Sequence, residues 1–229
     1  MAGAAKGFEV YLEVAEKRVV AGAIDWPGWC RIGKDEESAL WALADHGLRY
    51  SRVVHGAHLN FQAPSGPEEF KVVERLKGDA STEFGVAAGT LSGDAAPFGE
   101  EDLKRSMAIL RACWRAFDAA VEAAGKKELR KGPRGGGRDT QKIVGHVVEA
   151  EQGYLRALGR KFEKIDGEDA RVMLERTREA VEEALAAGSR GELPETGPRG
   201  GKIWKPRYFV RRSAWHVLDH AWEIEDRSE

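Results

Sequence analysis

Three histidines in the second half of the sequence have the spacing of a metal site. His216 and His220 are four residues apart, so on a helix they lie one above the other on the same face. Neutral imidazoles at this spacing can bind one cation together. A third histidine, His146, lies in an earlier segment of helical character. Three histidines from two facing helices would leave a metal with at least one open position, which is typical of catalytic sites.

The depth of these histidines in their helices favours a shared site. His146 and His216 both lie about two turns inside their segments, or roughly 10 to 13 Å from the start at about 1.5 Å per residue. They can therefore meet near the middle of a helical domain. We predict His146, His216 and His220 as metal ligands, with a trio of hydrogen-bonded core histidines as the alternative. Imidazole suits zinc, nickel, copper or iron, and three nitrogens alone do not choose between these metals.

Charged residues one helical turn from the histidines are candidates for catalysis. Glu149 follows His146 by three residues, and Glu223 follows His220 by the same step. Either carboxylate could act as a general base or accept a hydrogen bond from a ligand N–H. Arg212, one turn before His216, could orient an anionic substrate. For each of the three, a surface or salt-bridge role is the alternative.

The composition favours a folded, water-soluble chain. Hydrophobic residues make up 42% and charged residues 32% of the 229 residues, with a net charge of -2. This charge excludes a globally basic nucleic-acid binder but not a local basic patch. Two cysteines, Cys30 and Cys113, give neither a disulfide framework nor a cysteine-based zinc site. No signal peptide and no membrane span are expected, so the sequence predicts a cytoplasmic protein.

The second half of the sequence predicts four amphipathic helices. Apolar residues recur at three- and four-residue steps from Glu100 to Gly125, and again over 140–158 after a capping Asp139 or Thr140. A third helix is expected between Asp169 and Gly188, and a fourth from Pro206 to about Asp226. The glycine-rich segment 132–137 is predicted to be a loop. Four such helices predict an all-α four-helix bundle, whose core commonly holds metal sites.

The first half predicts an α+β domain with strands around one helix. Strands are expected over residues 8–14, 19–24, 30–32, 70–76 and 83–87, and a helix is expected from Lys34 or Asp35. A segment rich in Gly, Ala, Ser and Pro over 87–99 indicates a linker. We therefore expect two domains, residues 1–90 and residues 91–229.

The segment from Asp25 to Leu40, with its Pro-Gly turn and acidic helix start, resembles the HicB-like domains. These are typically antitoxins that bind a toxin, often with an attached DNA-binding segment. No helix-turn-helix or basic arm is visible in this sequence. The alternative is a scaffold or partner-contact module, because a fold does not fix a function.

Residues 100 to 226, with His146 on the second helix and His216 and His220 on the fourth, resemble the DinB/YfiT-like metalloenzymes. This resemblance implies a four-helix bundle that binds a divalent metal, with zinc or nickel expected, through the three histidines. Some members of this family are thiol-dependent transferases or isomerases. The resemblance thus implies a metal cofactor and, as an option, a thiol cofactor.

Two loop regions are locally basic. Residues 126–142 contain seven Lys or Arg, and residues 199–212 contain six with no acidic residue. Each precedes or contains a helix N-terminus, where backbone amides also favour anions. In a simple up-and-down bundle both loops lie at one end and form a basic rim, whereas a crossover connection separates them. A pair of solvated loops is the plain alternative.

The predicted function is that of a DinB-like metal-binding protein, with a small-molecule substrate and a transferase, isomerase or hydrolase activity. One alternative is a non-enzymatic HicB-like partner-binding module attached to a bundle with a structural metal. Another is a nucleic-acid-associated protein that uses the basic loops, although we expect no nucleic-acid partner. No membrane association is expected, and a homodimer is an option that the sequence leaves open.

Overall fold

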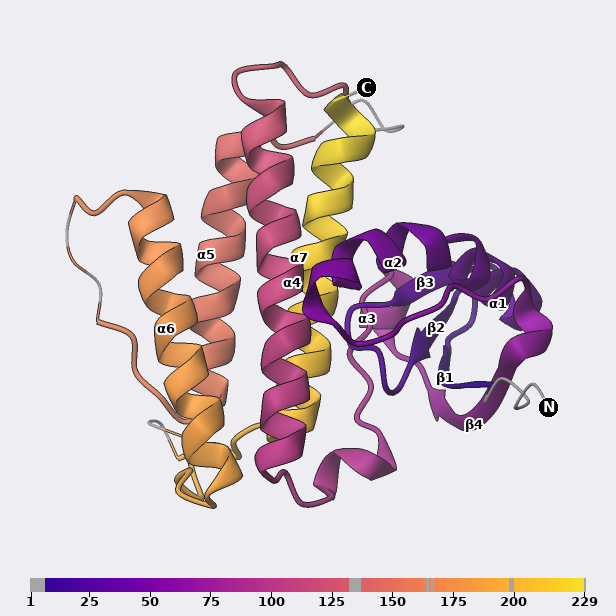
Figure 1. Cartoon of the computed structure of the whole chain (residues 1–229), viewed down its shortest axis with the longest axis horizontal. Helices are drawn as coiled ribbons and strands as arrows, with labels where there is room; N and C mark the ends of the chain where they lie inside the picture. Colours follow the sequence, from indigo (N-terminus) through magenta and orange to yellow (C-terminus); the bar gives the residue numbers. More distant parts are fainter. Residues whose placement is uncertain (1–6, 132–136, 164, 166, 198–199, 229) are drawn as a thin grey trace. The chain divides into compact units, whose positions relative to one another are not determined.

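The computed structural model describes residues 7–131, 137–163, 165, 167–197 and 200–228 (Figure 1). The chain divides into two compact units, Met1–Gly93 and Asp94–Glu229. The first is built on a β-sheet and the second on long helices, so the expected order of an α+β region and a helical region is confirmed. The two units are described separately below.

The first unit contains a four-stranded mixed sheet in the order β3-β2-β1-β4. Its strands are β1 Phe8–Val14, β2 Val19–Ala23, β3 Cys30–Gly33 and β4 Phe70–Lys77. β1 pairs antiparallel with β2 and parallel with β4. The parallel pairing of β1 with β4 requires a long connection, and its last part, between β3 and β4, contains two helices.

The chain between β3 and β4 forms two short helices and two 3₁₀ turns. They are α1 Glu36–Asp45, α2 Gly47–Val54, and the 3₁₀ turns η1 His55–Ala57 and η2 Pro67–Glu69. Asp35 caps α1, and its carboxylate accepts a hydrogen bond from the Ser38 amide at 2.8 Å. The buried Trp29 donates its indole N–H to the Leu43 carbonyl at 2.9 Å, which ties α1 to the sheet core.

The predicted strand over residues 83–87 is wrong. Residues Ala80–Glu83 form a short helix, α3, because the Asp79 carboxylate accepts hydrogen bonds from the Ser81 and Thr82 amides. Gly85 then adopts a positive φ of 84°, which ends regular structure. The alternation of polar and apolar residues suggested a strand, but the local capping interactions determine the conformation. The 3₁₀ turn η3, Ser92–Ala95, follows.

The second unit consists mainly of four long helices. They are α4 Glu100–Ala124, α5 Thr140–Ala157, α6 Ala170–Ser189 and α7 Pro206–Ser228. Their starts follow the expected rules. Asp139 and Asp169 cap α5 and α6, while three acidic residues occupy the first turn of α4. The predicted loop over 132–137 lies mostly outside the described residues.

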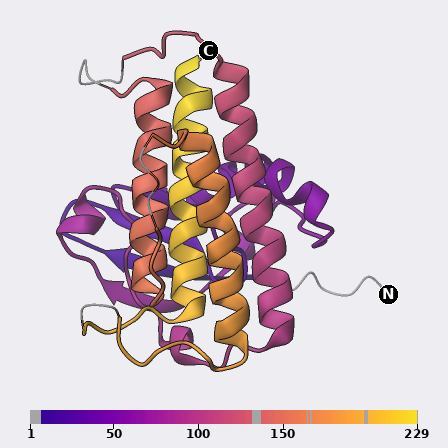
Figure 2. The same ribbon diagram turned by 90° about the vertical axis from the view of Figure 1, so that its left-hand side faces the viewer.

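The helices run in the order up, down, down, up (Figures 1 and 2). The Arg130 amide, after α4, donates to the Arg227 carbonyl near the end of α7, so α4 and α7 end together. The Trp204 amide, before α7, donates to the Ala157 carbonyl at the end of α5. Gly188 of α6 also lies beside Pro206. α5 and α6 are therefore parallel, and the segment between them crosses over the length of the unit.

The helix α7 is buried over most of its length, and it contacts both α4 and α5. Its buried residues include Phe209, Ala214, Val217, Leu218 and Ala221. A helix that is buried all round must hold its polar side chains against partners. The two histidines of α7 are such side chains.

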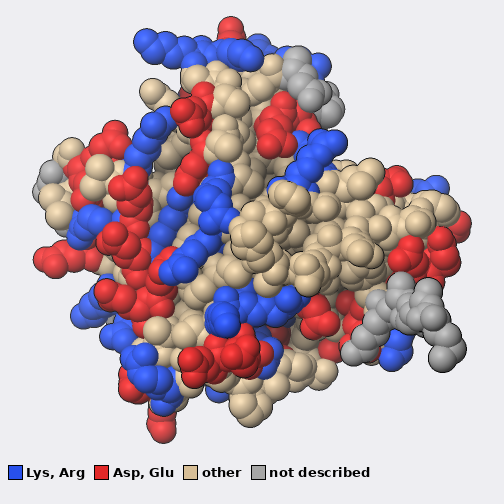
Figure 3. Space-filling view, in the orientation of Figure 1, with Lys and Arg blue, Asp and Glu red and all other residues tan. Residues whose placement is uncertain are grey.

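Acidic and basic side chains alternate over the helices on the face drawn in Figure 3. This mixture agrees with the small net charge of -2. No helix in the described part of the chain is long and apolar enough to cross a membrane.

Candidate metal centre

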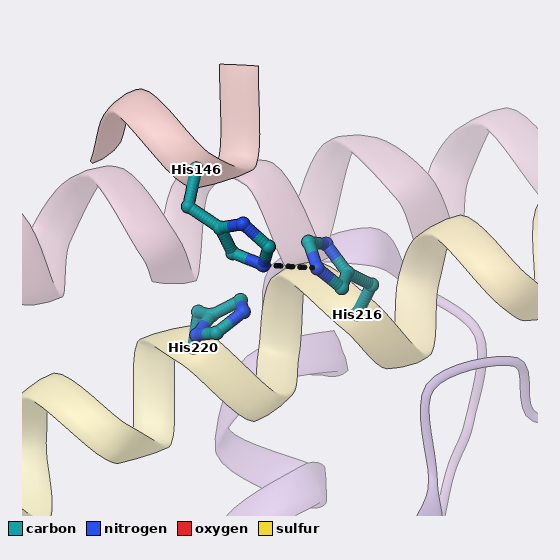
Figure 4. Close-up of side chains that lie close together, drawn as sticks. All are labelled: His146, His216 and His220. Carbon is teal, nitrogen blue, oxygen red and sulfur yellow. Dashed lines mark hydrogen bonds between the residues drawn. The ribbon is translucent and has the colours of Figure 1, made fainter. Parts of the chain in front are cut away.

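The three predicted ligands converge between α5 and α7 (Figure 4). His146 comes from α5, and His216 and His220 come from successive turns of α7. Asp139 fixes the start of α5, since its carboxylate accepts the Lys142 amide at 2.8 Å. The packing of the antiparallel α5 and α7 then brings His146 opposite the other two rings. We call these three residues the three-histidine cluster.

The spacing of the nitrogens suits a single metal ion. The Nε2 atoms of His146 and His216 are 3.3 Å apart, and the ligand atoms of all three residues lie within 4.8 Å of one another. Two nitrogens bound tetrahedrally to one zinc ion, each at about 2.0–2.1 Å, are about 3.4 Å apart. One pair already has this separation. A movement of at most about 1.4 Å would bring the widest pair to it.

The environment favours the neutral form of His146 and His216, which is the form that binds a metal. Burial lowers the pKa of His216 to about 2, and the neighbouring charges of His220, His146, Arg212 and Arg138 act in the same direction. The pKa of His146 is also lowered, chiefly by desolvation. His146 and His216 therefore present nitrogen lone pairs at neutral pH.

Glu223 orients one of the ligands. Its carboxylate accepts a hydrogen bond from Nδ1 of His220 at 2.9 Å and another from the Arg227 guanidinium at 2.7 Å. The His220 bond is the main cause of the lowered pKa of Glu223. With Nδ1 committed in this way, His220 presents Nε2 to the cluster. Metal-binding histidines commonly have such a carboxylate behind them, so the donor set fits a divalent metal.

Glu149, the second candidate acid, is exposed on α5. None of the hydrogen bonds or ion pairs found among the described residues involves it. Its negative charge nevertheless raises the pKa of His146, although desolvation outweighs this effect. Glu149 thus influences the cluster through its field and not through a contact.

Arg212 lies beside the cluster among aromatic rings. Its guanidinium carbon is 4.6 Å from the centre of the Trp215 ring and 5.6 Å from that of Tyr154. The Tyr154 ring in turn lies 5.6 Å from the His216 ring. The prediction singled out Arg212 but gave no role to Tyr154. Its position, eight residues or about two turns after His146, could have placed it on the same helix face.

The two basic loops lie at opposite ends of the helical unit. The Arg130 amide, in the first loop, donates to the Arg227 carbonyl at the end of α7, whereas the segment before α7 lies at the ends of α5 and α6. The crossover alternative therefore holds, and the loops form no common rim. Of the basic residues counted in these loops, Arg134 and Arg199 lie outside the described residues.

A family model described as the DinB superfamily matches residues 109–224, which is half of the chain. The chain belongs to the DinB superfamily. The matched region contains His146, His216 and His220. Neither a curated protein nor a solved structure matches this chain.

Proposed function

We propose that this chain is a metal-dependent DinB-type protein in which His146, His216 and His220 bind one divalent metal. The four helices would form the four-helix bundle of that type. The proposed activity is that of a transferase, isomerase or hydrolase on a small molecule, with a thiol as a possible cofactor class. A bound metal would supply Lewis-acid chemistry at its open positions.

The observation that carries this proposal is the convergence of three imidazoles on one point. Facing nitrogens can share one proton within a pair, but a third nitrogen then has no donor left from the cluster. A single cation satisfies all three lone pairs at once. The carboxylate of Glu223 behind His220 adds the support that ligating histidines commonly have.

Three residues around the cluster have proposed roles. Glu223 holds the His220 ring through a hydrogen bond, and its negative charge would stabilise the ring when the metal binds. Glu149 is proposed as a general base that reaches the cluster from the exposed side of α5. Arg212 is proposed to orient an anionic substrate. Zinc and nickel are proposed from the family resemblance, and the imidazole ligands are compatible with both metals.

The test is elemental analysis of purified protein beside variants. We expect about one metal ion per chain in the wild type and none in His216→Ala or His146→Ala. The matched control is His55→Ala, an exposed histidine of the first unit, which should keep the metal. A wild-type protein that contains no metal and takes up neither zinc nor nickel would overturn the proposal.

The unfolding midpoint and the turnover of a His220→Ala variant distinguish a catalytic metal site from a structural one. If the metal is structural, His220→Ala should lower the unfolding midpoint markedly, because metal binding then supplies folding free energy. If the metal is catalytic, the variant should stay folded and lose turnover on small electrophiles in the presence of a thiol.

For the first unit, residues 1–93, we propose a HicB-like partner-contact module. Two features support this proposal. Helix α1, capped by Asp35, follows β3, and β4 returns after the helices to pair directly with β1. Cytoplasmic localisation is proposed on composition alone. Pull-down with the full chain and with His216→Ala would show whether partner capture is independent of the metal centre.

A further inference from the structure

The first unit contains an open cavity of about 510 Å³ beside the start of β1. Three parts of the chain line it: the first residues of β1, the turn that contains Asp25 and Trp26, and the segment between Asn60 and Glu69. Small-molecule sites commonly have volumes of about 300–1,000 Å³, so this cavity is large enough for a ligand. None of the three clustered histidines belongs to this unit.

One wall of the cavity is aromatic. Phe8 and Trp26 line it, and their rings pack against Phe61, with centroid distances of 5.7 and 4.7 Å. The Phe8 ring also lies 5.1 Å from the ring of the buried Trp29. These contacts hold both rings in place, although Phe8 and Trp26 are only half-buried. Such rings can pack against the flat face of a ligand, and they attract a cation that lies over them.

The charged side chains that line the cavity are acidic. Glu9, Asp25 and Glu69 contribute carboxylates, and none of the lining residues in the described part of the chain is a lysine or an arginine. One oxygen of Glu69 accepts the Ser65 amide at 2.7 Å, and one oxygen of Glu9 lies 3.3 Å from the exposed Lys71 ammonium. An exposed ion pair of this kind is weak, so a cationic ligand can compete with Lys71 for Glu9.

Two amide side chains add neutral polar groups to the lining. Asn60 and Gln62 are exposed, and neither side chain has a hydrogen-bond partner among the described residues. Asn60 has a positive φ of 53°, a backbone conformation that asparagine adopts more readily than most residues. The two amide carbonyls are further acceptors for a ligand that carries several N–H donors.

We propose that this cavity binds a guanidinium group, either of a small molecule or of an arginine side chain in a partner chain. A guanidinium has one positive charge and five N–H donors, so it matches carboxylates and amide carbonyls together. Its planar face also stacks on aromatic rings, which favours it over an ammonium group. Glu9 and Glu69 bond to the guanidinium in this arrangement, and Trp26 packs against it.

The test is titration calorimetry on the full chain at low salt with two matched probes. One probe, Nα-acetylarginine amide, carries the guanidinium, whereas Nα-acetylcitrulline amide has nearly the same shape and no charge. We expect the arginine derivative to bind saturably and the citrulline derivative to bind at least about tenfold more weakly. Equal affinities for the two probes, or no binding of the arginine derivative, would overturn the proposal.

Variants locate the bound charge. Glu9→Gln and Glu69→Gln keep the size of the side chain and remove its charge, so each should weaken binding of the arginine derivative by about threefold, and the double variant by about tenfold. The control is Glu16→Gln, an exposed residue beyond the opposite end of β1, which should bind like the wild type. Unchanged affinity in the double variant, or an equal loss in the control, would overturn the proposal.

A pentapeptide with one arginine between glycines distinguishes the two sources of the guanidinium. Tighter binding of the peptide than of the arginine derivative would assign the cavity to a partner's arginine, and this assignment rests on the proposed partner-contact module. Weaker binding of the peptide would assign the cavity to a small molecule. Partner capture in the pull-down without binding of the arginine derivative would overturn the guanidinium site and leave the module standing, so the two failures are distinguishable.

Discussion

The helical unit contains two polar groups, each centred on buried side chains, that differ in the charges they bring together. One is the three-histidine cluster between α5 and α7. The other, which we call the Glu151–Arg178 group, joins α4, α5 and α6 and consists of Trp114, Asp118, Glu151 and Arg178. In the second group opposite charges face each other. In the first group imidazole nitrogens face each other.

The Glu151–Arg178 group is held together by hydrogen bonds and by contacts between opposite charges. The Trp114 indole donates to Glu151 at 3.0 Å, and Arg178 donates to both oxygens of Asp118, at 3.0 and 2.8 Å. The Arg178 Nε lies 3.8 Å from the second Glu151 oxygen. Residues of the chain itself supply the opposite charge. Among the described residues, Glu151 Oε2 and two Arg178 nitrogens are nevertheless buried without a hydrogen bond, as is Nδ1 of His216, so the two groups differ in the charges that face each other and not in how completely they are bonded.

The largest expected effect comes from breaking the charge balance. Arg178→Met leaves Glu151 and Asp118 without their cation, and we expect the free energy of unfolding to fall by about 3–5 kcal/mol. Urea unfolding with a chelator present measures this. Metal uptake by the folded fraction should not change. Arg171→Met, an exposed arginine on α6, is the control, and an equal loss in both variants would contradict the comparison.

The next effect is a pH dependence of stability. Burial raises the pKa of Glu151 from 4.5 to about 7. The folded chain therefore binds a proton that the unfolded chain releases between these values, so stability falls as pH rises from about 4.5 to about 7. The loss is on the order of 3 kcal/mol. In Glu151→Gln this contribution should disappear from unfolding curves recorded across that range. A slope equal to that of the wild type would show that Glu151 is not its source.

A smaller effect is expected on metal affinity when the carboxylate that bonds to His220 is changed. Glu223→Gln removes the charged acceptor for His220, and we expect metal affinity to fall by about 10- to 100-fold while the fold is retained. Competition with a chromophoric chelator measures the affinity. Glu179→Gln, an exposed glutamate on α6, should bind metal like the wild type. An unchanged affinity in Glu223→Gln would remove the carboxylate from the proposed centre.

The smallest effect is expected at Glu149. Because its carboxylate is exposed, solvent and salt screen its field, and Glu149→Gln should change metal affinity by less than about threefold. The same competition assay measures this. If the affinity falls as far as in Glu223→Gln, Glu149 must contact the metal or a ligand when the site is loaded. Once a substrate is known, a loss of turnover at constant affinity would support the proposed general base.

Local rules predicted much of the fold. The helix starts at Asp139 and Pro206 follow from capping and from the preference of proline for a first turn. Strands β1 and β4 follow from alternation of polar and apolar residues. The same alternation failed at residues 83–87, because the hydrogen bonds of Asp79 formed a helical turn. Pattern and capping compete over such short segments.

The sequence by itself determined that His216 and His220 share a helix face, since residues four apart on a helix must do so. Only the tertiary structure decided that His146 lies opposite them, that Glu223 and not Glu149 bonds to a ligand, and that Arg212 lies over Tyr154. These contacts depend on how α5 and α7 pack and on the direction given by the crossover before α6. Helix periodicity fixes which side chains share a face of one helix, but the packing of whole helices fixes which faces meet.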